Sequence, residues 1–262
     1  METTPELLAY YEQDREDGRL RAGRGRLEFW RTQDVLRRVL PPAPADVLDV
    51  GGGTGVHAEW LTADGYRVEL IDPMPLHVER AARLDGVTAR QGDARQLPVP
   101  DESVDAVLLL GPLYHLTDRA DRVRALAEAV RVVRPGGLVA AATISRYAAV
   151  HDMIYQGSYL LEEYREVACS AALDGVISHV RSGFTGYCHD PDDVPAEFAD
   201  AGLPDIARYG LQGPFWLYGD IDDWLDDPER RALMLDAQRR LESVPSLLGV
   251  SGHMLTLARK AP

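Results

Sequence analysis

The residues best suited to hold a polar or anionic ligand lie in one short glycine-rich segment. Asp49 lies near the end of a mostly apolar run, residues 47–50, and Gly51, Gly53 and Gly55 follow at alternate positions. Glycine accepts a positive φ and lets the backbone come close to a ligand. Where such a turn leads into a helix, its backbone N–H groups lie at the positive end of the helix dipole. The segment predicts a ligand-binding turn, although glycine also marks ordinary tight turns.

A second acidic residue ends the next apolar segment. Residues 67–72 form a predicted strand that finishes at Asp72. An acid at the tip of the second strand of a βαβ unit can accept hydrogen bonds from ribose hydroxyls. Because Pro73 follows, Asp72 could instead only cap a helix. Beside the glycine turn, the ribose interpretation is the better one.

Two candidate catalytic residues follow a third apolar run, residues 104–110, which is typical of a strand covered on both faces. His115 is the best placed general base, because imidazole titrates near neutral pH. A histidine before a helix cap often serves only in capping or packing, so that alternative stays open. Tyr114 is the second candidate. Aromatic residues that could line an acceptor pocket, or equally pack in the core, are Tyr114, Tyr155, Tyr187 and Trp216.

The elements that must position these side chains alternate along the chain. Strands are expected at 46–50, 67–72, 87–94, 104–110 and 138–144. Helices are expected at 27–40, 56–63 and from 117 or 118 to a turn at 134–137. This alternation indicates an α/β fold with a mostly parallel sheet and right-handed crossovers. Ligands bind at the carboxyl ends of the strands in such sheets.

Four regions are expected around this core. Residues 1–44 form an N-terminal helical cap, and 45–145 form the ligand-binding core. Residues 146–189, with helical spacing over 153–167, are interpreted as an insertion or lid over the acceptor site. Residues 190–262 complete the sheet. Within the cap, Tyr11 could close over a ligand or simply pack, and the basic segment 19–26 is interpreted as a solvated helix face.

Composition argues against several classes of partner. The 262 residues carry 42 acidic against 28 basic side chains and a formal charge of −14. Such a charge repels phosphate backbones and anionic membranes, so neither nucleic acid nor membrane is expected as a partner. Two cysteines are too few for a disulfide framework or a cysteine metal site, and no metal is expected. No apolar run is long enough for a membrane span, and no targeting segment is evident, which favours a cytoplasmic location. The oligomeric state is left open.

The order of these signals resembles the class I S-adenosylmethionine-dependent methyltransferases. The resemblance rests on the glycine turn, Asp72, the Gly92-Asp93-Ala94 segment, the strand at 104–110 and the Arg-Pro-Gly-Gly turn at 134–137, and it covers roughly residues 45–145. It implies a Rossmann-like fold with a seven-stranded, mostly parallel sheet and helices on both faces. The cofactor would be S-adenosyl-L-methionine.

The resemblance also implies residue roles. Asp49 and the backbone of Gly51, Gly53 and Gly55 would hold the methionine portion of the cofactor. Asp72 would bind the ribose hydroxyls, and Met74 would pack against the adenine ring. The remaining roles fall to Asp93 at the adenine amino group, the Ala94 N–H facing the ring, and the carbonyl of Leu110 or Gly111 at the cofactor amino group. Arg31 would meet the cofactor carboxylate, with an ordinary surface arginine as the alternative.

The resulting functional prediction is in-line methyl transfer to a small molecule, secondary metabolites included. The segment 111–115 lacks the Asn/Asp-Pro-Pro-Tyr/Phe pattern of nucleobase amino methylases. A non-catalytic S-adenosylmethionine-binding accessory or sensor protein is the main alternative. A nicotinamide oxidoreductase is a weaker one, because Val56 occupies the position of the last glycine in a Gly-x-Gly-x-x-Gly fingerprint.

Overall fold

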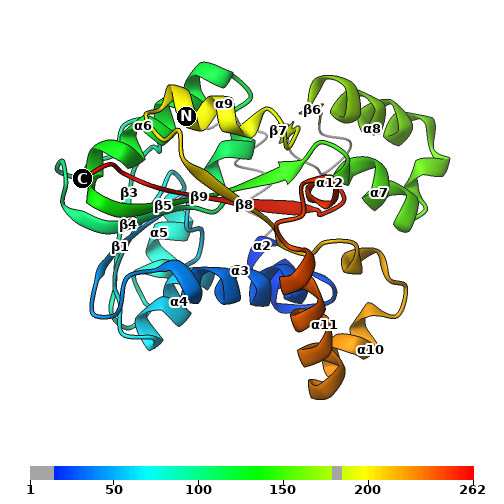
Figure 1. Cartoon of the computed structure of the whole chain (residues 1–262), viewed down its shortest axis with the longest axis horizontal. Coiled ribbons are helices and arrows are strands. Elements are labelled where there is room, and N and C mark those ends of the chain that lie inside the picture. Colours follow the sequence, from blue (N-terminus) through cyan, green and yellow to red (C-terminus); the bar gives the residue numbers. More distant parts are fainter. Residues whose placement is uncertain (1–14, 179–184) are drawn as a thin grey trace.

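The computed structural model describes residues 15–178 and 185–262. Its centre is a sheet in which seven strands follow the order β3–β2–β1–β4–β5–β9–β8 (Figure 1). The parallel strands are β1 (Asp46–Val50), β2 (Arg67–Asp72), β3 (Val87–Gln91), β4 (Val104–Leu109) and β5 (Val133–Ser145). β8 (Ile206–Gly210) and β9 (His253–Arg259) form the antiparallel pair. The expected α/β fold with a mostly parallel sheet is confirmed, but within the described residues two further short strands beside β5 bring the sheet to nine strands instead of the expected seven.

Helices cover both faces of this sheet, as the apolar strands require. Alternate residues of β1 point to opposite sides, with Val47 in one core and Leu48 in the other. The Val47 side is covered by α3 (Gly25–Val39), α4 (Val56–Ala63) and α5 (Pro75–Ala81). The Leu48 side is covered by α6 (Arg119–Val132) and α9 (Val194–Asp200). Figure 1 shows these two layers above and below the sheet.

The Arg-Pro-Gly-Gly segment lies within the strand that follows α6. β5 begins at Val133, directly after that helix, where a strand was expected only from residue 138. Val104 pairs with Val133, but Ala106 already pairs with Leu138, so residues 134–137 form an irregularity in the β4–β5 ladder. Gly136 has a φ of 76°, which explains the glycine there.

The segment after β5 folds into two helices and a short hairpin. These are α7 (Ala148–Tyr155), the 3-10 turn η2 (Ser158–Leu160), α8 (Glu162–Asp174), β6 (Val176–Ile177) and β7 (Gly186–His189). The single helical stretch expected over 153–167 is wrong, because Gly157 has a φ of 74° and interrupts it. β7 pairs in parallel with the end of β5, at Ile144 and Cys188.

The remaining elements lie before α3, after β4 and after β8. α2 (Arg15–Arg21) precedes α3. After β4 comes the 3-10 turn η1 (Pro112–His115). After β8 come η3 (Phe215–Leu217), α10 (Ile221–Asp226), α11 (Pro228–Leu241) and α12 (Pro245–Leu248), and α10 and α11 project below the sheet in Figure 1. Within the described residues, none of the helices has the length and apolarity needed to traverse a bilayer.

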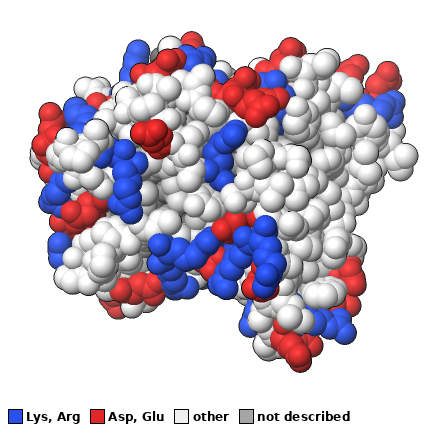
Figure 2. All heavy atoms as spheres, in the orientation of Figure 1, with Lys and Arg blue, Asp and Glu red and all other residues white. Residues whose placement is uncertain are grey.

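A buried ionic cluster joins α3 to the region after α11. Arg31 is fully buried, and its guanidinium pairs with Asp34 and Glu242 and donates to the Leu211 carbonyl at 3.3 Å. Arg38 also donates to Glu242 at 2.8 Å. On the face shown in Figure 2, basic and acidic side chains lie interleaved in the region of α3. The cluster therefore fixes the position of α3 against the C-terminal part of the chain.

Replacing Glu242 by alanine should destabilise the fold strongly. Arg31 would remain buried with one of its two carboxylate partners removed, which typically costs about 3 kcal/mol or more. The free energy of unfolding is measured by urea denaturation. Asp236→Ala is the matched control, because Asp236 forms only an exposed pair with Arg240 and should change stability by less than about 1 kcal/mol. Equal effects of the two substitutions would contradict this account.

Candidate active site

A cavity of about 140 Å³ lies at the carboxyl ends of β1, β2 and β4. The chain passes from β1 outward to β2 and β3 and then returns to place β4 on the other side of β1. Such a switch in strand order is where open α/β sheets bind ligands. Predicted site residues that line the cavity are Asp49, Gly51, Gly53, Asp72, Met74, Asp93, Ala94, Leu110, Tyr114 and His115.

The glycine turn between β1 and α4 takes the conformation that its sequence predicts. Gly51, Gly53 and Gly55 all have positive φ, of 68°, 58° and 95°. A side chain at Gly53 would meet no atom within 4 Å, so this residue faces open space in the cavity. Gly55 is not among the lining residues; a Cβ there would lie 2.5 Å from Cδ1 of Leu84. Gly55 therefore serves helix packing, which corrects its expected place at the ligand.

Asp49 is the most unusual group of the cavity. It is fully buried, and neither carboxylate oxygen has a hydrogen-bond partner among the residues that the structure describes. Burial, together with the nearby charge of Asp72, raises the pKa of Asp49 to about 7. Gly52 passes directly over this carboxylate, since a Cβ there would lie 2.6 Å from Oδ2. The turn thus leaves the carboxylate dry and available to a ligand.

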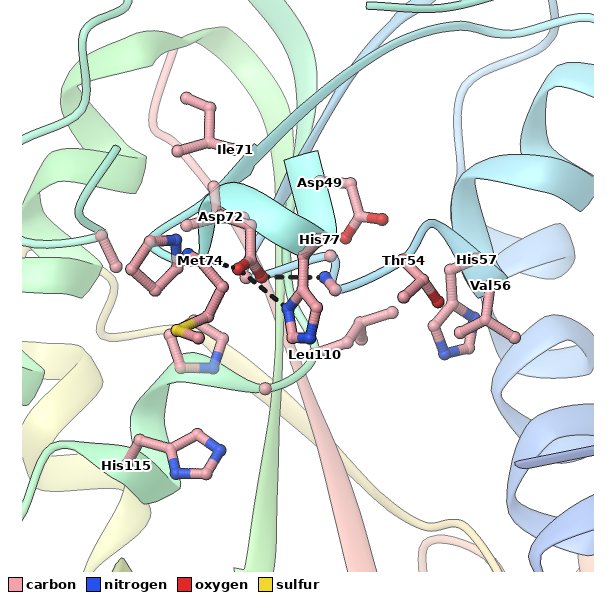
Figure 3. Close-up of a pocket in the computed structure, with 18 of the residues that line it drawn as sticks. Asp49, Thr54, Val56, His57, Ile71, Asp72, Met74, His77, Leu110 and His115 are labelled. Atoms are coloured by element: carbon pink, nitrogen blue, oxygen red, sulfur yellow. Dashed lines mark hydrogen bonds and ion pairs between the residues drawn. The ribbon is translucent and has the colours of Figure 1, made fainter. Parts of the chain in front are cut away.

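Asp72 holds the turn in place (Figure 3). Its Oδ2 accepts from the Gly53 N–H at 2.9 Å, and its Oδ1 accepts from the Met74 N–H at 2.9 Å. Nδ1 of His77 lies 3.0 Å from Oδ1. A carboxylate has about four acceptor positions, so one more remains for a ligand hydroxyl. His77 was not foreseen, although its position in the helix after Asp72 is the signal that could have indicated it.

Asp93 lies at the cavity but is bound to its own neighbour. The Arg95 N–H donates to Oδ1 at 2.9 Å, and the Arg95 guanidinium donates to Oδ2 at 2.8 Å. Arg95 also contacts Asp121 at 2.6 Å, which ties the segment to α6. These contacts orient the Asp93–Ala94 backbone toward the cavity. The adenine role of both residues stays a prediction.

The wall formed by α2, α3 and α4 contains residues that the sequence did not indicate as part of the site. Arg19, from the basic segment expected to be solvated, donates to Glu28 at 2.6 Å, and both residues line the cavity. Burial raises the pKa of Glu28, but the charges of Arg19 and His253 outweigh it and bring the pKa to about 2. Burial lowers the pKa of His57 to about 4. At neutral pH this wall therefore carries a charged Glu28 and a neutral His57.

The two candidate catalytic residues lie on η1, after β4. Both line the cavity, and their rings are 4.7 Å apart between centroids. Figure 3 shows His115 on the far side of the cavity from His57. His115 therefore occupies the strand end from which it was expected to act. Its catalytic role stays a prediction.

A second cavity, of about 400 Å³, adjoins the first. Arg19, Glu28 and Tyr114 line both cavities, so the two share a wall. The rest of the second cavity comes from the start of α3, from α7, from the ends of β5 and β7, and from Gln212, Trp216, Gly252 and His253. Of the four aromatic residues expected to line an acceptor pocket, Tyr114 and Trp216 line this cavity, whereas Tyr155 and Tyr187 do not.

Arg31, a predicted cofactor residue, is not at the site. Arg31 does not line the cavity, because its guanidinium is held by Asp34 and Glu242 in the cluster described above. The expectation that it meets the cofactor carboxylate is corrected accordingly. Arg19 is the arginine of this region that does face the cavity. Tyr11 lies outside the described residues.

Comparison with known proteins agrees with this geometry. Residues 48–141 match the family model described as a methyltransferase domain. An uncharacterized methyltransferase of Mycobacterium tuberculosis is 45% identical over 106 residues, 40% of this chain and 42% of that protein. The 27-O-demethylrifamycin SV methyltransferase of Amycolatopsis mediterranei is 32% identical over 160 residues, 58% of each chain. The chain thus spans about half the length of these curated relatives.

Comparison with solved structures agrees with these sequence matches. A solved structure from Thermotoga maritima, described as an S-adenosylmethionine-dependent methyltransferase and possible histamine N-methyltransferase, aligns with a TM-score of 0.60 at 17% identity. The alignment covers 96% of this chain and 98% of that one. Residues 48–141 are thus similar to methyltransferase domains, and the chain has the fold of the class I S-adenosylmethionine-dependent methyltransferases. S-adenosylmethionine is the cofactor of that class.

The residues present suit this cofactor. Its methionine portion carries an ammonium group, and the unpartnered carboxylate of Asp49 is a complementary buried anion. Asp72 retains an acceptor position for a ribose hydroxyl. The buried Met74 and the Ala94 segment supply apolar surface at the same end of the cavity.

Asp49 should give the cofactor-free protein a characteristic pH dependence. In the unfolded chain its pKa is about 4, whereas in the fold it is about 7. Between these values the folded state keeps a proton that the unfolded state has lost, so the free energy of unfolding falls as pH rises from about 4 to about 7. The contribution is on the order of a few kcal/mol.

Urea denaturation between these pH values measures the effect. Asp49→Asn should remove this part of the slope, because the amide does not titrate. Asp205→Asn, at an exposed position, is the control and should keep it. An unchanged slope in Asp49→Asn would show that Asp49 is ionised throughout.

Proposed function

We propose that this protein transfers the methyl group of S-adenosylmethionine to a small molecule bound in the second cavity. The observation that carries the proposal is the wall of Arg19, Glu28 and Tyr114 that the two cavities share. A donor held in the first cavity and an acceptor held in the second would meet at this wall. The bound cofactor supplies an electrophilic methyl group on a sulfonium, and transfer is an in-line displacement.

For such a reaction the protein mainly binds, aligns and excludes water. Asp49 and the glycine turn would hold the methionine portion, and Asp72 the ribose. α7 contributes Ala148, Ala149 and Asp152 to the second cavity, and β6 and β7 contribute Ile177 and Cys188. This placement supports the interpretation of residues 146–189 as a lid over the acceptor.

The titrating groups that line the first cavity differ in what they can do. Glu28, with a pKa of about 2, and His57, with a pKa of about 4, are both weak bases at neutral pH. His115 is the imidazole that we assign as general base for an acceptor that arrives protonated, and Tyr114 is assigned to the wall where the acceptor meets the methyl group.

The choice of a small molecule has two supports. The formal charge of −14 disfavours nucleic acid. Named relatives include the rifamycin methyltransferase and a ubiquinone/menaquinone biosynthesis C-methyltransferase of Acidiphilium cryptum, 38% identical over 118 residues and covering 45% of that protein. The alternative of a cofactor-binding accessory or sensor protein makes a different prediction, since it binds S-adenosylmethionine without consuming it.

Incubation with S-adenosylmethionine and small-molecule cell extracts tests the proposal. Formation of S-adenosylhomocysteine, followed by mass spectrometry, should depend on both extract and protein, and isotope from a labelled methyl group should enter an extract component. Saturable cofactor binding with no turnover in any extract would favour the accessory protein. Saturable binding of NADH in place of S-adenosylmethionine would overturn the family-based choice of donor.

Replacing His115 by alanine should lower turnover by about a hundredfold while leaving the affinity for S-adenosylmethionine within about twofold of the wild type. The reason is that a general base acts on the acceptor and not on cofactor binding. Initial rates and calorimetric titration measure the two quantities. Tyr114→Phe is the companion variant, which keeps the ring beside His115. Unchanged turnover in His115→Ala would remove the imidazole from the mechanism.

A further inference from the structure

One arginine of the second cavity contacts two aromatic rings. Arg24 immediately precedes α3, and its guanidinium carbon lies 4.5 Å from the ring centre of Tyr155 and 5.3 Å from that of Trp216. Trp216 is fixed in turn, because its Nε1 donates to the Val250 carbonyl at 2.9 Å. Stacked aromatic rings restrict the plane of a guanidinium and attract its charge. Arg24 is therefore oriented before any ligand arrives.

The hydrogen bonding of Arg24 is incomplete. Its Nη2 donates to Oδ1 of Asp152, whose Oδ2 accepts from Gln156 at 2.7 Å. Its Nη1 is buried and has no hydrogen-bond partner within the described ranges 15–178 and 185–262. A buried N–H without a partner is costly, so such groups usually have a ligand or water to bind. Arg24 lines the second cavity, which is where a partner for Nη1 would lie.

The other two basic side chains that line this cavity, Arg19 and His253, already have hydrogen-bond or ion-pair partners. Arg19 binds Glu28 through both terminal nitrogens, at 2.6 and 3.1 Å. His253 contacts Glu28 at 3.2 Å and Gln212 at 2.8 Å. Glu28 and its partners therefore form a satisfied network at the shared wall. Arg24 differs from them, because its Nη2 pairs with Asp152 while its buried Nη1 has no hydrogen-bond partner among the described residues.

We propose that the methyl acceptor carries a carboxylate, and that Arg24 recognises this group through Nη1 at the end of the second cavity formed by α7 and η3. The inference rests on the proposed function, because it takes the second cavity to be the acceptor site. A charged partner is favoured over a carbonyl, since hydrogen bonds between ionised groups are about twice as strong as neutral ones. A monoanion is favoured over a phosphate dianion, because Asp152 already compensates part of the arginine charge. The surrounding Ile144, Ala148 and Ile177 would contact the apolar body of the acceptor.

Pairs of small aromatic acids and their amides test the inference directly. Benzoate, cinnamate and 2-naphthoate are titrated against benzamide, cinnamamide and 2-naphthamide, with the full chain saturated with S-adenosylhomocysteine, by ligand-observed NMR. Each acid should bind on the order of tenfold more tightly than its amide. Arg24→Gln should abolish the preference, and Arg24→Lys should restore only part of it. Arg83→Gln, which breaks an exposed pair with Glu79, should retain it fully.

The same samples separate this inference from the proposed function. Each variant is first titrated with S-adenosylmethionine, and wild-type affinity shows that the fold and the first cavity are intact. Equal binding of acids and amides, retained preference in Arg24→Gln, or no binding of any probe at its solubility limit would overturn the carboxylate assignment while leaving the methyl donor intact. Failure of the wild type to bind S-adenosylmethionine would instead contradict the proposed function.

Discussion

The burial of the Asp49 carboxylate without a hydrogen bond is the constraint on which the site depends. An ionised carboxyl in such surroundings is strongly unfavourable, and the group responds by a pKa raised to about 7. The sequence around it maintains this state, because Gly52 leaves no room for a side chain between the turn and the carboxylate. A cationic ligand removes the cost that the free protein bears. The cost of burying this carboxylate and its attraction for a cationic ligand therefore have the same origin.

The order of the strands explains why two cavities meet at one wall. The switch between β1 and β4 opens the first cavity, and the extension of β5 beyond β4 provides the space for β7 and α7 beside it. α3 connects the two regions, since Glu28 lies at the shared wall while Arg31, one turn further on, anchors the helix through Glu242. The position of the wall thus depends on a buried ion pair that has no contact with either cavity.

The local parts of this arrangement could be predicted from the sequence. β1, β2 and α4 have the expected bounds, because each is a short apolar or amphipathic run ended by a residue with a strong conformational preference, such as Gly65 with its φ of 93°. The positions of Asp49 and Asp72 follow from those strands. Gly55 shows the limit of the approach, because its requirement is contact with Leu84 and not with a ligand.

The parts that could not be predicted depend on contacts distant in sequence. Arg31 was expected at the cofactor from the family resemblance, or else at the surface, but it is buried against Glu242, which lies 211 residues away. Arg19 was taken for a surface residue, but pairing with Glu28 brings it to both cavities. Likewise, the second cavity is formed where α3, α7 and the η3 region pack together, and no local pattern encodes such a meeting.

The most direct test of the account is the number of protons released when S-adenosylmethionine binds. Calorimetric titration near pH 6.5, in two buffers of different ionisation enthalpy, measures this number. An ammonium group beside Asp49 should lower its pKa, so we expect release of a substantial fraction of one proton in the wild type and almost none in Asp49→Asn. Binding without proton release in the wild type would contradict the assignment of Asp49 as the buried partner of the cofactor.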